Sequence, residues 1–152
     1  MFKKFIATLA MTATLSIGFT AVGDTQQAEA ASYHTKAISV AKSNLGVKYK
    51  WGGITPSGFD CSGLLKYSFA KAGKTLPRTA RDMYTKGTRV SSSSLKPGDL
   101  LFYAPTKASR PTHVAMYVGS GKVINSSSSK GVSYFYTNNS YWKPKFLGAK
   151  RI

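Results

Sequence analysis

The sequence predicts one α+β domain in which helices come first and antiparallel strands follow. Apolar residues recur at helical spacing up to about residue 87, whereas beyond Pro97-Gly98 they alternate with a period of two. Short turn sequences such as Gly119-Ser120-Gly121 separate the alternating runs. The sequence has no internal repeat and no long linker, so a single domain accounts for it.

The first thirty residues have the composition of a secretory signal peptide. Residues 3–4 are lysines, residues 5–22 are apolar and uncharged, and Ala28-Glu29-Ala30 is a small-x-small cleavage sequence. We therefore expect cleavage after Ala30. The product is a single domain over residues 31–152, without an integral membrane segment, that is secreted or associated with the cell wall.

Three helical segments are expected in the first half of this domain. The first covers residues 32–45, with Ser32 or Thr35 as its N-cap. A loop rich in glycine and proline follows, and the second helix runs from residue 61 to a glycine stop at residue 73. A short third helix follows Pro77 and ends before Gly87.

The second half is expected to form an antiparallel sheet of about five strands. The second and third of its β-rich runs are joined by a tight glycine turn, which predicts a hairpin. The five runs cover residues 99–104, 113–119, 122–127, 132–137 and 146–152.

The net charge of +17 belongs entirely to the expected mature domain. The two lysines of the signal segment balance its two acidic residues, and the mature domain has only Asp60, Asp82 and Asp99 as acids. Such a field attracts anionic polymers in a salt-dependent way. The basic residues are scattered and no nucleic-acid motif is present, so we expect an anionic wall polymer such as teichoic acid rather than nucleic acid.

Cys61 is the only cysteine, and it is placed at the first turn of the second helix. It cannot form an intramolecular disulfide, so it is either a small buried hydrophobe or a reactive thiol. Backbone N–H groups and the helix dipole at a helix start favour the thiolate. The position therefore favours a nucleophile.

A cysteine nucleophile needs a histidine and a group that orients it. His113 opens a predicted strand, whereas His34 lies among polar neighbours on the first helix and is expected at the surface. Asn125 lies on the strand that pairs with that of His113, where its amide can hold the imidazole tautomer. The two histidines and three aspartates have no metal-ligand spacing, so we expect neither a metal nor another cofactor.

Taken together, the motifs resemble those of the NlpC-type cell-wall cysteine peptidases, which are papain-like bacterial enzymes that cut peptidoglycan stem peptides. The resemblance extends from about residue 33 to residue 152, and its D-C-S-G, P-G-D-L and H-V-x-x-Y-x-G elements are the most specific. The matching segments are YKWGG (49–53), FDCSGLLKYSF (59–69), LPRTA (76–80), LKPGDLLFY (95–103), HVAMYVGSGKVINSSSSKGV (113–132) and YW (141–142).

The resemblance implies roles for individual residues. Cys61 corresponds to the nucleophile, His113 to the general base and acid, and Tyr49 to a tyrosine that helps form the oxyanion site. Asp60 and Ser62 match positions that hold the L-Ala amine in some members, although Asp60 also fits a helix cap. Many members carry histidine where this chain has Asn125, and asparagine orients an imidazole without carrying charge.

Two further features complete the expected site and its surroundings. Trp51, in the glycine-rich loop, is expected to line the substrate groove, whereas the aromatic residues clustered over 134–142 are expected mainly in packing. Asp99 follows Pro-Gly and is expected to order a turn, and Asp82 is expected to be solvated.

The function implied by the resemblance is hydrolysis of the γ-D-glutamyl–diamino acid bond of the stem peptide through a thioester. Two alternatives remain open from the sequence. One is an amidase or cross-bridge peptidase on the same scaffold, and the other is a catalytically weak cationic protein that binds the wall.

Overall fold

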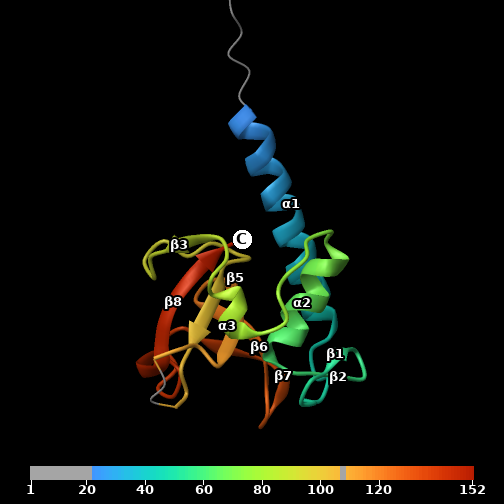
Figure 1. Cartoon of the computed structure of the whole chain (residues 1–152), viewed down its shortest axis with the longest axis vertical. Helices are drawn as coiled ribbons and strands as arrows, with labels where there is room; N and C mark the ends of the chain where they lie inside the picture. Colours follow the sequence, from blue (N-terminus) through green and yellow to red (C-terminus); the bar gives the residue numbers. More distant parts are fainter. Residues whose placement is uncertain (1–21, 107–108) are drawn as a thin grey trace, which may run out of the picture.

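A computed structural model describes residues 22–106 and 109–152. Its helices are α1 (Val22–Ser43), α2 (Cys61–Lys71) and α3 (Ala80–Met83), with a 3₁₀ turn, η1 (Lys143–Lys145), near the C-terminus. The main sheet has six antiparallel strands in the order β3-β8-β4-β5-β6-β7. In Figure 1, α1 and α2 stand beside this sheet, which confirms the expected α+β class.

All five expected strands are present, and three further ones were not expected. The expected strands are β4 (Leu100–Tyr103), β5 (His113–Gly119), β6 (Lys122–Ser127), β7 (Gly131–Tyr136) and β8 (Phe146–Arg151). The additional ones are β3 (Thr88–Val90) and a small hairpin of β1 (Ile54–Thr55) and β2 (Gly58–Phe59). Two of the three β3 residues are exposed, so this edge strand has no apolar alternation by which the sequence could reveal it.

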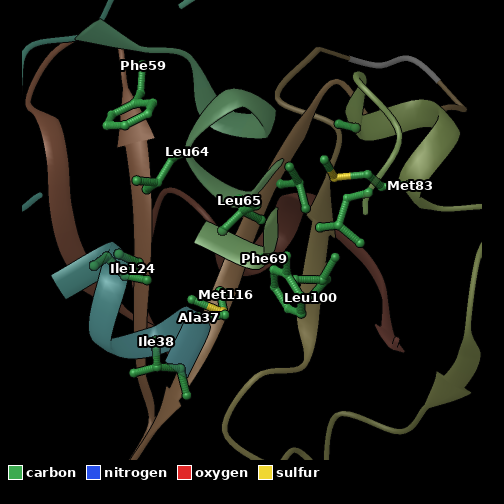
Figure 2. Close-up of a cluster of buried hydrophobic side chains, with 14 of the residues drawn as sticks. Ala37, Ile38, Phe59, Leu64, Leu65, Phe69, Met83, Leu100, Met116 and Ile124 are labelled. Atoms are coloured by element: carbon green, nitrogen blue, oxygen red, sulfur yellow. The ribbon is translucent and has the colours of Figure 1, made fainter. Parts of the chain in front are cut away.

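The main core lies between the helices and one face of the sheet. The α2 helix packs on β5 and β6, and α1 packs on α2. Figure 2 shows how Leu64, Leu65 and Phe69 of α2 meet Met116 and Ile124 of the strands. Because the side chains of a strand alternate between its faces, β4 contributes Leu100 and Phe102 to this core. These contacts hold the start of α2 against the sheet.

A second, smaller core lies on the opposite face of the sheet. The alternate β4 residues, Leu101 and Tyr103, belong to it, and so does Ala115 of β5. Trp142, in the segment between β7 and β8, packs against this cluster. The segment that follows β7 is thereby brought next to the first residue of β5.

The first helix begins earlier than expected. The sequence predicted a start at Ser32 or Thr35, but α1 is already helical at Val22. The Thr35 hydroxyl donates a hydrogen bond to the carbonyl oxygen of Ala31, 2.8 Å away and one turn earlier in the same helix, so Thr35 is not an N-cap. The described side chains before Ala30 are exposed, so this part of the helix has no apolar face by which the sequence could reveal it.

His34 is buried, so the expectation of a surface position was wrong. Its Nε2 lies 3.1 Å from the carbonyl oxygen of Ile152. Gly98 lies so close to the ring that a Cβ atom there would be 2.5 Å from the Cγ of His34. Burial lowers the pKa of this imidazole. His34 therefore packs α1 against the turn before β4 and the residue after β8.

Asp99 orders the turn before β4, as expected, and it also fixes β8. Its carboxylate accepts a hydrogen bond of 2.7 Å from the backbone N–H of Lys96. Both carboxylate oxygens also accept hydrogen bonds of 2.8 Å from Arg151, one from Nε and one from Nη2. The Asp99 side chain is completely buried, which makes this pair an important link between β8 and the rest of the sheet.

Candidate active site

The start of α2 is built by Asp60 and the glycine loop before it. Asp60 is the N-cap, and its carboxylate accepts a hydrogen bond of 2.7 Å from the backbone N–H of Gly63. A Cβ atom on Gly63 would lie 1.9 Å from the carbonyl oxygen of Gly53. Only glycine permits this approach, which packs the loop directly onto the first turn of the helix.

Cys61 is the first residue of this helix and faces the start of β5. Its Sγ lies 3.9 Å from the carbonyl oxygen of Thr112, the residue immediately before His113. The backbone N–H groups of Cys61, Ser62 and Val114 lower its pKa, as expected for a helix start, but burial has the larger effect. The pKa of the thiol is therefore raised, and the expectation of a preformed thiolate is not supported.

His113 and Asn125 meet across the hairpin of β5 and β6. The amide nitrogen of Asn125 lies 3.0 Å from Nε2 of His113, and both side chains are buried. An amide either donates to a bare Nε2 through its nitrogen or accepts from Nε2–H through its oxygen. With the amide nitrogen facing a bare Nε2, the ring proton is on Nδ1; turning the amide by 180° lets its oxygen accept from Nε2–H and leaves Nδ1 with a lone pair that is able to take a proton. The sequence had placed these two residues side by side correctly.

The imidazole of His113 is strongly desolvated. Burial lowers its pKa to about 4, so the ring is neutral at neutral pH. The resting pair is consequently a thiol and a neutral imidazole. A neutral imidazole next to a protonated thiol is arranged for general-base catalysis, in which the proton moves as the sulfur attacks.

Trp142 covers the His113 ring and was not identified as a site residue from the sequence. The two rings are stacked, with centroids 4.3 Å apart and planes inclined by 18°. The ring of Phe135, in β7, also stacks on Trp142, with centroids 5.4 Å apart. The Tyr-Trp pair at 141–142 was the available signal, but the sequence could not show that a loop after β7 returns to β5.

Arg78 is the second site residue that sequence reasoning missed. Its Nη1 lies 3.1 Å from one carboxylate oxygen of Asp60, and its Nη2 lies 2.6 Å from the other. Nη1 also donates to the hydroxyl of Ser62 at 2.8 Å. Asp60 is thus a helix cap that is already paired with a guanidinium, and both Asp60 and Ser62 belong to one network beside the thiol. The LPRTA segment was part of the quoted resemblance, but its arginine was not assigned a role.

Of the two remaining expected site residues, Tyr49 lines the cavity and Trp51 does not. Tyr49 is half-buried and lines the same cavity as Cys61 and His113. Its pKa is raised, first by burial and then by the nearby Cys61 and Asp60. Trp51 is 88% exposed, and it is not among the described residues that line the cavity.

The candidate site opens into a cavity of about 550 Å³. Cys61, His113 and Asn125 line it together with Tyr49 and Trp142. The β6–β7 hairpin adds the four serines at residues 126–129 to the lining. Within residues 22–106 and 109–152, no group of three or more histidine, cysteine or acidic side chains is placed to hold a metal ion.

A cysteine at a helix start, facing a histidine at the first position of an antiparallel strand, defines the papain-like α+β class. Residues 46–151 match the model of the NlpC/P60 family. The chain belongs to this family, as its motifs predicted.

Individual relatives agree with this assignment. The γ-DL-glutamyl hydrolase of Bacillus subtilis is 46% identical over 129 residues, covering 82% of this chain and 31% of the relative. The bifunctional muramidase/DL-endopeptidase CwlT of the same organism is 43% identical over 109 residues, covering 70% and 33%. The solved peptidoglycan hydrolase RipB of Mycobacterium tuberculosis superposes with a TM-score of 0.69 at 33% identity, covering 83% of this chain and 67% of that one. The chain spans about a third of the length of the two curated relatives.

Proposed function

We propose that this protein is a secreted cysteine endopeptidase that hydrolyses peptidoglycan stem peptides at the bond between D-Glu and the diamino acid. The observation that carries the proposal is the convergence of Cys61, His113 and Asn125 on one cavity. The names of the relatives, a γ-DL-glutamyl hydrolase and a DL-endopeptidase among them, support this choice of bond.

The proposed reaction begins with proton transfer from Cys61 to Nδ1 of His113. The sulfur attacks the γ-carbonyl carbon of D-Glu, and the developing oxyanion is stabilised by backbone N–H groups at the start of α2 and by the hydroxyl of Tyr49. The imidazolium then protonates the leaving amine, the C–N bond breaks, and a thioester remains. Water, deprotonated by His113, hydrolyses the thioester and restores the thiol.

Asn125, Asp60 and Ser62 have supporting roles in this proposal. Asn125, with its amide oxygen turned toward Nε2–H, holds the His113 tautomer that leaves Nδ1 free, while Asp60 caps α2 and orients the cysteine. Ser62 and Arg78 complete the network around the carboxylate of Asp60. Both carboxylate oxygens of Asp60 already accept hydrogen bonds from Arg78. Asp60 therefore contributes to binding a stem amine together with Arg78 and Ser62, not as a free carboxylate. Trp51, on the surface beside the glycine loop, is assigned to contacts with more distant parts of the stem.

We also propose that cleavage after Ala30 releases the domain from a signal peptide whose first 21 residues lie outside the described part of the chain. The described side chains from Gly23 to Glu29 are exposed, whereas Tyr33 and His34 pack against the domain. Cleavage after Ala30 therefore removes turns of α1 whose described side chains up to Glu29 are exposed. None of the helices in the described ranges is long and apolar enough to cross a membrane.

The function is tested with the 31–152 protein and its Cys61→Ala variant. Each is incubated with peptidoglycan and with soluble muropeptides, and the products are identified by mass spectrometry. We expect muropeptides truncated to L-Ala-D-Glu with the parent only. Release of whole stem peptides would instead indicate an amidase, and loss of bridge residues a cross-bridge peptidase. No new products from several wall types would favour a wall-binding protein without catalysis.

The charge of the domain leads to a separate prediction about binding. We propose that the net charge of +17 attracts the enzyme to anionic wall polymers such as teichoic acid. Sedimentation with isolated walls should fall several-fold between about 50 mM and 500 mM salt, because exposed charges are screened over a few ångströms at high salt. Walls stripped of teichoic acid should bind less protein at low salt. Binding that is unchanged by both treatments would contradict the proposal.

A further inference from the structure

The β6–β7 hairpin contributes a polar wall to the cavity that the reaction above does not use. Ser126 and Ser127 end β6, Ser128, Ser129 and Lys130 form the turn, and all five residues line the cavity. The hydroxyl of the buried Ser126 already donates to the carbonyl oxygen of Phe59 at 2.7 Å, which leaves those of Ser127 to Ser129. The backbone N–H of Lys130 donates to the carbonyl oxygen of Ser127 at 3.3 Å and closes the turn. This wall therefore offers hydroxyl groups and one ammonium group to a bound molecule.

The hairpin is held firmly at the position of Lys130. The next residue, Gly131, has a φ of +67° and lies so close to the loop after α1 that a Cβ atom would be 2.3 Å from the carbonyl oxygen of Val47. Val132 donates a hydrogen bond of 2.9 Å to the same carbonyl and accepts one of 2.9 Å from Gly46. The backbone that carries Lys130 is thus fixed relative to the body of the domain, and only its side chain is free to adapt.

The charge distribution of the cavity favours a negatively charged ligand. Among the described residues that line it, Lys130 is the one cation and none is acidic. The two ion pairs in the described part of the chain involve Arg78 and Arg151, not Lys130. The Lys130 ammonium is consequently available to a ligand without first breaking an internal ion pair.

A γ-glutamyl substrate has a carboxylate close to the bond that is cut. When D-Glu is linked through its side chain, its α-carboxylate stays free, and three carbon atoms separate it from the carbonyl carbon that Cys61 attacks. At ordinary bond lengths this separation is about 5 Å. An α-linked glutamate has its side-chain carboxylate at the same number of bonds from its own carbonyl carbon, so a cation here does not by itself separate the two linkages. What a cation near the attacked carbonyl distinguishes is a free carboxylate from its neutral amide.

We propose that Lys130, supported by the hydroxyl groups of the serine turn, binds the free α-carboxylate of the γ-linked D-glutamyl residue and selects for it. The inference deepens the proposed function and depends on it. It identifies a specificity-determining residue on an element that carries neither Cys61 nor His113. Amidation of that carboxylate is expected to make a poorer substrate.

The test compares two synthetic stem tetrapeptides, L-Ala-γ-D-Glu-L-Lys-D-Ala and its counterpart with the α-carboxylate of D-Glu amidated. For the parent, kcat/KM should be about tenfold higher for the free carboxylate, as expected for a partly exposed hydrogen bond between charged groups. In Lys130→Gln the ratio should fall close to one, with the loss confined to the free acid. Lys86→Gln makes the same change of charge on an exposed residue outside the cavity lining and should keep the ratio of the parent.

The possible failures of this test are distinguishable. An unchanged ratio in Lys130→Gln, or an equal loss on both peptides, would overturn the carboxylate subsite while leaving the endopeptidase intact. A third peptide, amidated at the C-terminal D-Ala, should be cut equally well by the parent and should show the same loss in Lys130→Gln as the free acid.

If the parent cleaves none of the peptides, the proposed function fails, and binding decides the inference separately. Calorimetry with Cys61→Ala and with Cys61→Ala/Lys130→Gln measures the preference for the free acid without turnover. We expect about tenfold tighter binding of the free acid only where Lys130 is present. Equal affinities of Cys61→Ala for both peptides would rule out the subsite.

Discussion

Replacing His113 with glutamine is expected to lower kcat/KM for the stem peptide by at least about 10⁴-fold, the order of effect seen when a base is removed from a nucleophile–base pair. The reason lies in the desolvation of both groups. Burial raises the pKa of Cys61, so even fewer thiols are ionised at pH 7 than the few per cent of an exposed cysteine. Without the imidazole, almost no nucleophile forms. Steady-state hydrolysis of a defined stem peptide measures the effect.

Two controls separate this explanation from misfolding. Activity of His113→Gln should recover partly above pH 9, where hydroxide ionises the thiol, whereas Cys61→Ala should show no recovery. The double variant Cys61→Ala/His113→Gln should be no less active than Cys61→Ala alone, because the two residues act as a unit. A His113→Gln enzyme with more than a hundredth of the parent kcat/KM would contradict the general-base role.

The acid side of the parent's pH profile follows from the same group. His113 must be neutral to accept the thiol proton, and its pKa is lowered to about 4. The kcat/KM of the free enzyme should therefore persist down to about pH 5 and fall as the pH approaches 4. A midpoint near 6.5, the ordinary value for histidine, would show that the ring is more hydrated than its burial indicates.

Replacing Arg151 with alanine is expected to lower the free energy of unfolding by about 3 kcal/mol, since the buried carboxylate of Asp99 is then left without its cation. Asp99 is completely buried and receives two hydrogen bonds from Arg151. After the substitution, Lys96 N–H is the remaining donor to Asp99 in the described structure. Against a typical total of about 5–15 kcal/mol, this is a large fraction of the stability.

Urea unfolding followed by circular dichroism measures this change. Arg89→Ala, on the exposed edge strand β3, removes an arginine of the same sheet without touching a buried acid, and it should change the unfolding free energy by less than about 0.5 kcal/mol. The double variant Arg151→Ala/Asp99→Asn should be more stable than Arg151→Ala, because the uncompensated charge is then removed. Equal losses in Arg151→Ala and Arg89→Ala would show that the pair contributes little.

The parts of the fold with a strong hydrophobic period were predictable from the sequence. The strands β5 and β6 were expected over 113–119 and 122–127, the ranges in which they occur, because apolar alternation and a glycine turn define both ends. The start of α2 at Cys61 was equally clear from its cap and its apolar face. The pairing of His113 with Asn125 followed from the hairpin.

Contacts between distant segments were not predictable from pattern alone. His34 has polar neighbours in the sequence, but it is buried because the residue after β8 and the Gly98 turn close over it. Trp142 reaches His113 only because the chain after β7 folds back across the sheet. Arg78 lies in a loop whose path toward Asp60 has no local signal. In each case the contact depends on how distant segments of the chain pack together, which no local sequence pattern indicates.

The position of β8 has a consequence for how the domain comes into being. This strand comes last in the order of the described strands, yet it lies inside the sheet between β3 and β4 rather than at its edge. Until residues 146–151 have left the ribosome, β3 has no partner in the sheet and β4 lacks one of its two neighbours. The domain therefore cannot complete its native sheet before then. For the exported precursor proposed above, we expect a chain that still lacks β8 to stay unfolded and able to pass through a translocation channel.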